Sequence, residues 1–83
     1  MFKVVIIEDE PLARNKLKRL LEYMPDEITV IAELSSVTET DNWLRSGGHA
    51  DLIFSDIELN DGNVFQSYQR YTPPCPLIFI TAY

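Results

Sequence analysis

The chain alternates short apolar runs with segments in which apolar residues recur every three or four positions. Apolar runs of this length are typical of strands buried on both faces, and the second pattern is typical of helices with one buried face. The runs predict four strands, at about 3–8, 28–34, 51–57 and 77–81. Between them the periodic segments predict three helices, at about 11–24, 37–44 and 63–71.

Local signals set the expected ends of the helices. Pro11 suits the first turn of a helix, and Pro25 should end that helix because it forces the preceding residue out of the α region. Ser36 and Glu39 have the spacing of a capping box at the start of the second helix. The pair Gly47-Gly48 is typical of a helix end. Residues 60–63, Asn-Asp-Gly-Asn, predict a turn by composition.

Regular alternation of strand and helix predicts one α/β domain with a parallel sheet and right-handed crossovers. Ligands in such sheets bind outside the carboxyl ends of the strands. The first helix should turn one apolar stripe to this sheet. The stripe residues are Ala13, Leu17, Leu20, Leu21 and Met24.

Acidic residues follow two of the predicted strands. Glu8 and Asp9 come after the first strand and Asp56 after the third, so parallel strands would bring three carboxylates to one sheet edge. Like charges about 4 Å apart repel by roughly 4 kcal/mol at an effective dielectric near 20, so the cluster indicates a bound cation, shifted pKa values, or both. Oxygen ligands of this kind suit Mg²⁺. A carboxylate beside Mg²⁺ can attack phosphorus, and the hydroxyl of Thr81 could help to neutralise the transferred group.

Composition narrows the function classes. The 83 residues carry a net charge of -6, and no basic stripe is present to neutralise nucleic-acid phosphates. The single cysteine, Cys75, excludes an intrachain disulfide. No apolar run is long enough to span a bilayer, and residues 1–3 enter a strand without the layout of a signal peptide. We therefore expect a cytoplasmic domain with no membrane partner.

Three segments together resemble a known family. They are Val4–Pro11 (VVIIEDEP), Asp51–Leu59 (DLIFSDIEL) and Pro76–Tyr83 (PLIFITAY). The chain is similar to the receiver domain of two-component response regulators, and most similar to regulators with a LytTR-type DNA-binding domain. The resemblance implies a flavodoxin-like (CheY-like) doubly wound sheet with strand order 2-1-3-4.

The resemblance also implies roles for individual residues. It implies that Asp56 accepts a phosphoryl group from the phosphohistidine of a sensor histidine kinase, in a signalling domain with at most weak self-phosphatase activity rather than in an enzyme. It implies that Mg²⁺ is held by Glu8, Asp9, Asp56 and the main-chain carbonyl of Glu58. The phosphoryl contacts that it implies are the hydroxyl of the switch residue Thr81 and the N–H of Ala82.

The sequence departs from the family pattern in two places. Asn60 stands where many members have proline, a change that the turn should tolerate. The larger departure is that residues 1–83 match only the N-terminal part of a receiver domain. The fifth strand, the last two helices, the phosphoryl-pairing lysine and the DNA-binding output domain are all missing, so we expect impaired phosphorylation.

Two other interpretations remain open at this point. The chain could be folded but unable to accept phosphate, and could act as an interaction module that dimerises through an exposed fourth strand or an uncovered helix face. Alternatively, a strand-end Glu with Asp56-x-Glu58 loosely resembles the acidic set of TOPRIM domains, which would indicate a Mg²⁺-dependent phosphotransfer or nuclease domain.

Overall fold

The computed structural model describes residues 1–25 and 27–80 and contains a four-stranded parallel sheet in the order β2-β1-β3-β6. Its strands are β1 (Phe2–Ile7), β2 (Ile28–Leu34), β3 (Leu52–Asp56) and β6 (Leu77–Ile80). The helices are α1 (Pro11–Glu22), α2 (Val37–Arg45) and α3 (Phe65–Arg70). The predicted α/β fold and its strand order, 2-1-3-4 when β6 is counted as the fourth strand, are therefore confirmed.

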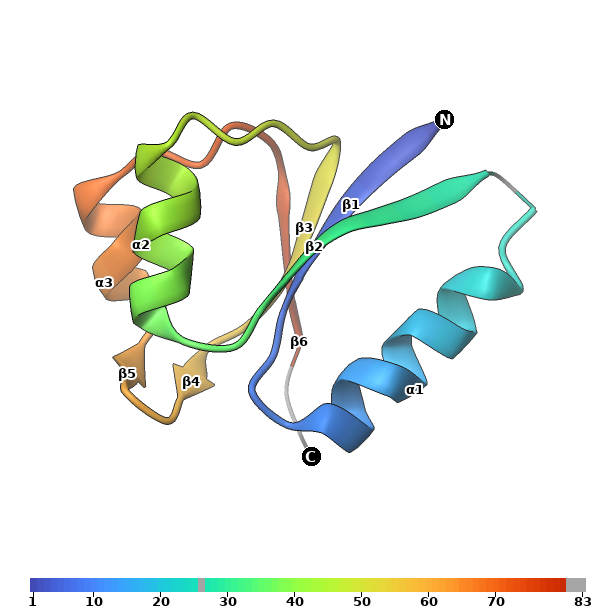
Figure 1. Ribbon diagram of the computed structural model, residues 1–83, viewed down its shortest axis with the longest axis horizontal. Helices are drawn as coiled ribbons and strands as arrows, with labels where there is room; N and C mark the ends of the chain where they lie inside the picture. Colours follow the sequence, from blue (N-terminus) through green and yellow to red (C-terminus); the bar gives the residue numbers. More distant parts are fainter. Residues whose placement is uncertain (26, 81–83) are drawn as a thin grey trace.

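The helices cover the two faces of the sheet unequally (Figure 1): α2 and α3 lie on one face, and α1 lies on the other. The central strand β1 is buried on both faces, and Val4 to Ile7 are fully inaccessible to solvent. The main core lies between the sheet and the α2–α3 layer. It consists of Val5, Ile7, Leu34, Val37, Ile53, Leu59 and Val64.

The opposite face is more open. No residue of α1 is buried, and Leu20 and Met24 from its predicted apolar stripe are 56% and 51% exposed. Part of the stripe borders an apolar groove of about 520 Å³ that runs between α1 and the sheet, with Leu21, Met24, Phe54 and Ile78 among its walls. Helix α1 therefore meets the sheet along one side of a groove and not over a closed core.

The start of α2 follows the predicted signal closely. Ser36 Oγ accepts a hydrogen bond from the N–H of Glu39 at 3.0 Å. In return the Glu39 carboxylate accepts the N–H of Ser35 at 3.1 Å, one residue before the cap. The interaction is thus a capping box displaced by one residue.

The end of α2 depends on two glycines. Gly47 has φ of 78°, and its N–H donates to the carbonyl of Leu44 while that of Gly48 donates to the carbonyl of Trp43. These two bonds form a Schellman motif. A Cβ on Gly48 would lie 2.2 Å from the Trp43 ring, so no larger residue fits without displacing the indole.

Three features differ from the prediction: α1 ends earlier, α3 begins at Phe65 and not at 63, and a hairpin precedes α3. Helix α1 ends at Glu22, three residues before Pro25, because the N–H groups of Tyr23 and Met24 donate to carbonyls three residues back and tighten the last turn. The predicted turn at 60–63 is part of a small antiparallel hairpin that the sequence did not predict. Its strands are β4 (Glu58–Leu59) and β5 (Gly62–Asn63), and it follows β3 directly.

Candidate functional site

Three carboxylates converge at the carboxyl ends of β1 and β3. Glu8 and Asp9 follow β1, Asp56 ends β3, and the two strands are paired in parallel up to Ile7 and Ser55. One carboxylate oxygen from each of these three residues lies within 4.8 Å of the others. Glu8 is only 3% exposed, whereas Asp9 and Asp56 are half-buried and open to solvent. The convergence expected from the strand-end positions is present.

The electrostatics of this cluster are unfavourable without a cation. Burial and, to a smaller extent, contact with the neighbouring Asp56 carboxyl together raise the pKa of Glu8 to about 7. The N–H of Glu10, 3.4 Å from Glu8 Oε2, acts in the opposite direction. Near neutral pH the Glu8 carboxyl is therefore protonated in part of the molecules, which relieves repulsion within the cluster.

Main-chain hydrogen bonds fix the two acidic strand ends. The N–H of Glu8 donates to the carbonyl of Leu34 on β2 at 2.9 Å, and Arg14 Nη1 donates to the carbonyl of Glu8 at 2.9 Å. Asp56 Oδ1 accepts the N–H of Ile57 at 2.8 Å. Arg14 also pairs with Glu33 at 3.3 Å. In the sequence, Arg14 is simply a residue of the first helix that does not belong to its apolar stripe. Nothing in the pattern indicated that its side chain would contact the end of β1.

A pair of hydroxyl groups, from the buried Ser55 and the half-buried Tyr68, contacts the main chain of Asp56. The hydroxyl of Ser55 donates to the carbonyl of Asp56 at 3.0 Å, and the Tyr68 hydroxyl lies 2.9 Å from Ser55 Oγ. Burial raises the pKa of Tyr68, so the phenol stays protonated and serves as a donor. This chain of contacts links α3 to the main chain of the candidate phosphoacceptor.

The side chain of Glu58, another predicted site residue, lies outside the acidic cluster. Glu58 is exposed on β4, and its carboxylate accepts the side-chain N–H of Asn63 at 3.1 Å, outside the cluster of three carboxylates. The TOPRIM interpretation requires the Asp56 and Glu58 side chains to act together, so this arrangement does not support it. Thr81 and Ala82 lie outside the described residues; Ile80, the last residue of β6, pairs with Asp56.

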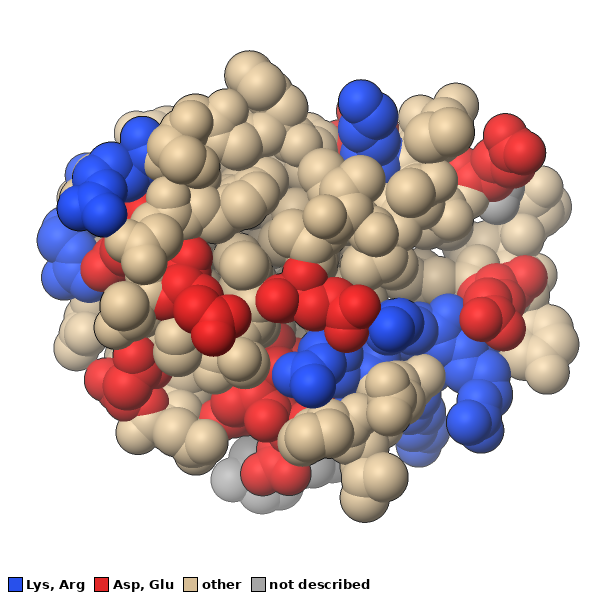
Figure 2. Space-filling model, viewed as in Figure 1, with Lys and Arg blue, Asp and Glu red and all other residues tan. Residues whose placement is uncertain are grey.

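The donor set fits a hard divalent cation. Oxygen ligands from one or two carboxylates are what Mg²⁺ takes from proteins, and Glu8, Asp9 and Asp56 offer three within reach of one ion. Figure 2 shows acidic side chains gathered at the lower edge of the molecule, and lysines and arginines gathered over α1.

Within residues 1–25 and 27–80, no helix has the length and apolarity that a membrane span requires.

Sequence comparison identifies relatives over the whole chain. The profile of the response regulator receiver domain matches residues 4–83. The sensory transduction protein LytT of Bacillus cereus is 36% identical over 86 residues, covering 100% of this chain and 34% of that protein. LytT of Enterococcus faecalis is 39% identical over 83 residues, covering 96% of this chain and 34% of that protein. The chain spans about a third of the length of these curated relatives.

Solved structures share the fold. The MaeR response regulator bound to beryllium trifluoride superposes with a TM-score of 0.81 at 26% identity, covering 100% of this chain and 69% of that one. RcsB from Salmonella enterica serovar Typhimurium, bound to promoter rprA with a phosphomimetic, gives a TM-score of 0.82 at 20% identity and covers 100% of this chain and 71% of that one. The second likeness is evidence for the fold alone.

Proposed function

The chain belongs to the response regulator receiver domain family, and from this premise we propose that it accepts a phosphoryl group on Asp56 from the phosphohistidine of a sensor histidine kinase. One observation supports the choice of residue: Asp56 is a half-buried carboxylate that shares a site of less than 5 Å with Glu8 and Asp9 at the carboxyl edge of a parallel sheet. Ligands bind at this edge in open α/β folds.

The proposed reaction is a transfer between two proteins. A carboxylate oxygen of Asp56 attacks phosphorus, the bond between phosphorus and the histidine nitrogen breaks, and that nitrogen keeps the electron pair. The product is an acyl phosphate on Asp56. Asp56 Oδ1 already accepts the N–H of Ile57, so one carboxylate oxygen is held while the other is left to react.

Mg²⁺ is the cofactor of this proposal. Its ligands would be the carboxylates of Glu8, Asp9 and Asp56 and the main-chain carbonyl of Glu58, and the ion would supply neutralisation of the phosphoryl oxygens. Glu8 must be fully ionised to act as a ligand, so cation binding releases its proton. The hydroxyl of Thr81 and the N–H of Ala82 are the proposed contacts to the phosphoryl group.

We expect transfer to residues 1–83 to be slow. No lysine follows Lys18 in the sequence, and Lys18 itself pairs with Glu33 on β2 at 3.0 Å. Within residues 1–83, Lys18 is therefore engaged with Glu33 and is not available to a phosphoryl group on Asp56. Hydrolysis of the acyl phosphate, a weak self-phosphatase activity, would reset the domain.

The relatives suggest how the signal leaves the domain. Those named above are called sensory transduction proteins, and one relative from Staphylococcus aureus, 38% identical over 84 residues, is called a transcriptional regulatory protein. Since this chain covers about a third of their length, DNA binding is proposed for an output domain outside residues 1–83. We also propose that this domain acts in the cytoplasm.

We also propose that a second copy of the chain pairs with the edge strand β6, beside the open face of the sheet. Within the described residues β6 pairs with β3 alone, so the N–H and C=O groups on its other side form a free edge. Ile78 on that strand is 45% exposed and borders the apolar groove. An edge strand beside apolar surface is suited to pairing with the same strand of another copy.

Phosphorylation of Asp56 can be tested by mass spectrometry. With a small-molecule phosphodonor and Mg²⁺, the intact chain should gain one phosphoryl group, and Asp56→Asn should gain none. Asp51→Asn is the matched control, because Asp51 lies at the opposite end of β3 and its carboxylate accepts only the N–H of Lys3 among the described residues. Equal labelling of Asp56→Asn and the wild-type chain would refute the assignment.

A further inference from the structure

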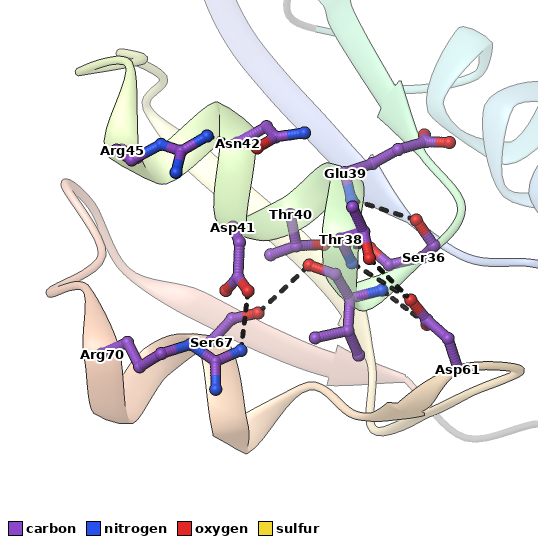
Figure 3. A network of polar contacts seen from close by, with 11 residues as sticks. Ser36, Thr38, Glu39, Thr40, Asp41, Asn42, Arg45, Asp61, Ser67 and Arg70 are labelled. Carbon is purple, nitrogen blue, oxygen red and sulfur yellow. Dashed lines mark hydrogen bonds and ion pairs between the residues drawn. The ribbon is translucent and has the colours of Figure 1, made fainter.

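Among the described residues, the hairpin that follows the candidate phosphoacceptor forms hydrogen bonds with α2 through one side chain, Asp61. Strands β4 and β5 pair Glu58 with Asn63 and Leu59 with Gly62, which leaves Asn60 and Asp61 as the two-residue turn. From this turn the Asp61 carboxylate reaches the first turn of α2 (Figure 3). The hairpin could form without these contacts, which join its tip to a helix more than 20 residues earlier in the chain.

Asp61 satisfies the helix donors that the local cap does not reach. The N–H of Val37 donates to Asp61 Oδ1 at 2.7 Å, and the N–H of Thr38 donates to Oδ2 at 3.1 Å. The hydroxyl of Thr38 adds a third contact at 3.3 Å. Ser36 caps only the N–H of Glu39. The first three helical N–H groups therefore have side-chain acceptors, two of them from the hairpin.

The base of the hairpin is joined through the main chain to Asp56, a member of the acidic cluster. Asp56 Oδ1 accepts the N–H of Ile57, and the carbonyl of Ile57 accepts the N–H of Val64 at 2.8 Å. Glu58 follows immediately and pairs with Asn63 through main chain and side chain. The main chain at 57–58 is thus held between Asp56 on one side and the Asp61 anchor on the other.

A ribbon of two strands with two residues each is not stable alone, so its contacts with the rest of the domain decide where it lies. Leu59 provides one anchor, since it is 94% buried in the main core. That apolar contact is non-directional and resists rotation of the ribbon poorly. The bidentate carboxylate of Asp61 provides the directional anchor.

We propose that Asp61 is a positioning residue for the phosphoacceptor site. Through its bonds to α2 it holds the hairpin, and with it the main chain of Ile57 and Glu58, in place beside Asp56. This inference rests on the proposed function, in which the carbonyl of Glu58 serves the cation. It adds a residue that touches neither the cation nor the phosphoryl group.

The test compares two ways of weakening the same helix end. Asp61→Ala removes the hairpin anchor, whereas Ser36→Ala removes a cap from the same turn of α2 and leaves the hairpin contacts in place. Mg²⁺ affinity is measured by calorimetry, and the labelling rate of Asp56 by mass spectrometry. Outer-shell substitutions at metal sites cost about 10-fold or more in affinity, and we expect a loss of that order in Asp61→Ala and less than about 2-fold in Ser36→Ala. Amide exchange within 57–63 should accelerate only in Asp61→Ala.

The outcomes separate the two proposals. If both variants keep the wild-type affinity and rate, or lose them equally, Asp61 has no positioning role, although the proposed function stands. If the wild-type chain neither binds Mg²⁺ nor is labelled, the proposed function fails and the positioning role fails with it. If Asp61→Ala does not fold, Asp61→Asn, which keeps one acceptor oxygen, takes its place in the test. A Mg²⁺ affinity of Asp61→Asn that lies between the affinities of the wild-type chain and Ser36→Ala would also contradict the proposal.

Discussion

At the scale of residues, the pair of Ser55 and Tyr68 is unusual because it places two hydroxyl groups within an apolar core. Ser55 is fully buried, and Tyr68 packs against the core and against the Phe79 ring, with centroids 6.3 Å apart. Buried hydroxyl groups are costly unless they are hydrogen-bonded. The contact of 2.9 Å between them meets this requirement, and Ser55 passes the link on to the carbonyl of Asp56.

Tyr68→Phe should therefore destabilise the chain modestly. The substitution keeps the ring and removes one hydrogen bond, so we expect a loss of about 1 kcal/mol in the free energy of unfolding. For a domain of this size such a loss corresponds to roughly 4–8 °C in Tm, measurable by circular dichroism. Tyr23→Phe is the control, because Tyr23 is 81% exposed and its loss should leave Tm unchanged. Equal Tm values for the two variants would contradict the role of the buried pair.

These residues mark the limit of inference from the sequence. Strand-end position sufficed to predict that Glu8, Asp9 and Asp56 would meet, because parallel strands put their carboxyl ends at one edge. It did not separate the buried Glu8 from the half-buried Asp9. Nor could periodicity connect Tyr68 with Ser55, since that contact depends on how α3 packs on β3.

At the scale of elements, the hairpin and the first turn of α2 form one unit (Figure 3). The turn at 60–63 was predicted from composition, but strands of two residues are too short to show an alternating pattern. The predicted cap, Ser36, accounts for one of the three helix donors that side chains satisfy. An ion pair of 2.6 Å between Asp41 and Arg70 joins α2 to α3.

The cap from Asp61 makes part of the stability depend on pH. Hydrogen bonds from the main-chain N–H of Val37 and then of Thr38 lower the pKa of Asp61 below its ordinary value of 3.8. A carboxyl with a lowered pKa in the folded state contributes stability above its unfolded pKa and loses it as pH falls through the folded pKa. The difference in Tm between the wild-type chain and Asp61→Asn should therefore be constant above about pH 5 and shrink below about pH 4.

Ser36→Ala provides the comparison for this pH profile. It removes a cap on the same turn without removing a titratable group, so its difference in Tm from the wild-type chain should stay nearly constant over the range. Thermal unfolding in a series of buffers measures both differences. A difference for Asp61→Asn that does not change between pH 3 and pH 7 would show that the carboxylate charge has no part in the cap.

At the scale of the whole molecule, the two faces of the sheet differ in how far they are covered. The alternation of elements predicted a parallel sheet with right-handed crossovers, and the resemblance to the receiver family implied the strand order. It did not predict how loosely α1 would cover its face, since the amphipathic pattern of a helix gives the direction of its apolar side and not the depth of burial. The groove beside Ile78 is the result.

Self-association through this face can be tested against the charge of the chain. A net charge of -6 repels a second copy, and salt screens that repulsion, so an apolar dimer should strengthen as ionic strength rises. We expect light scattering after size exclusion to show a dimer of the wild-type chain at high micromolar concentration. Ile78→Lys should give a monomer, because it places a charge on the edge strand within the groove. Leu12→Lys is the control, because it changes the net charge equally at an 85% exposed position outside the groove, and it should remain a dimer. A monomeric wild-type chain, or the same oligomeric state in both variants, would exclude this face as the interface.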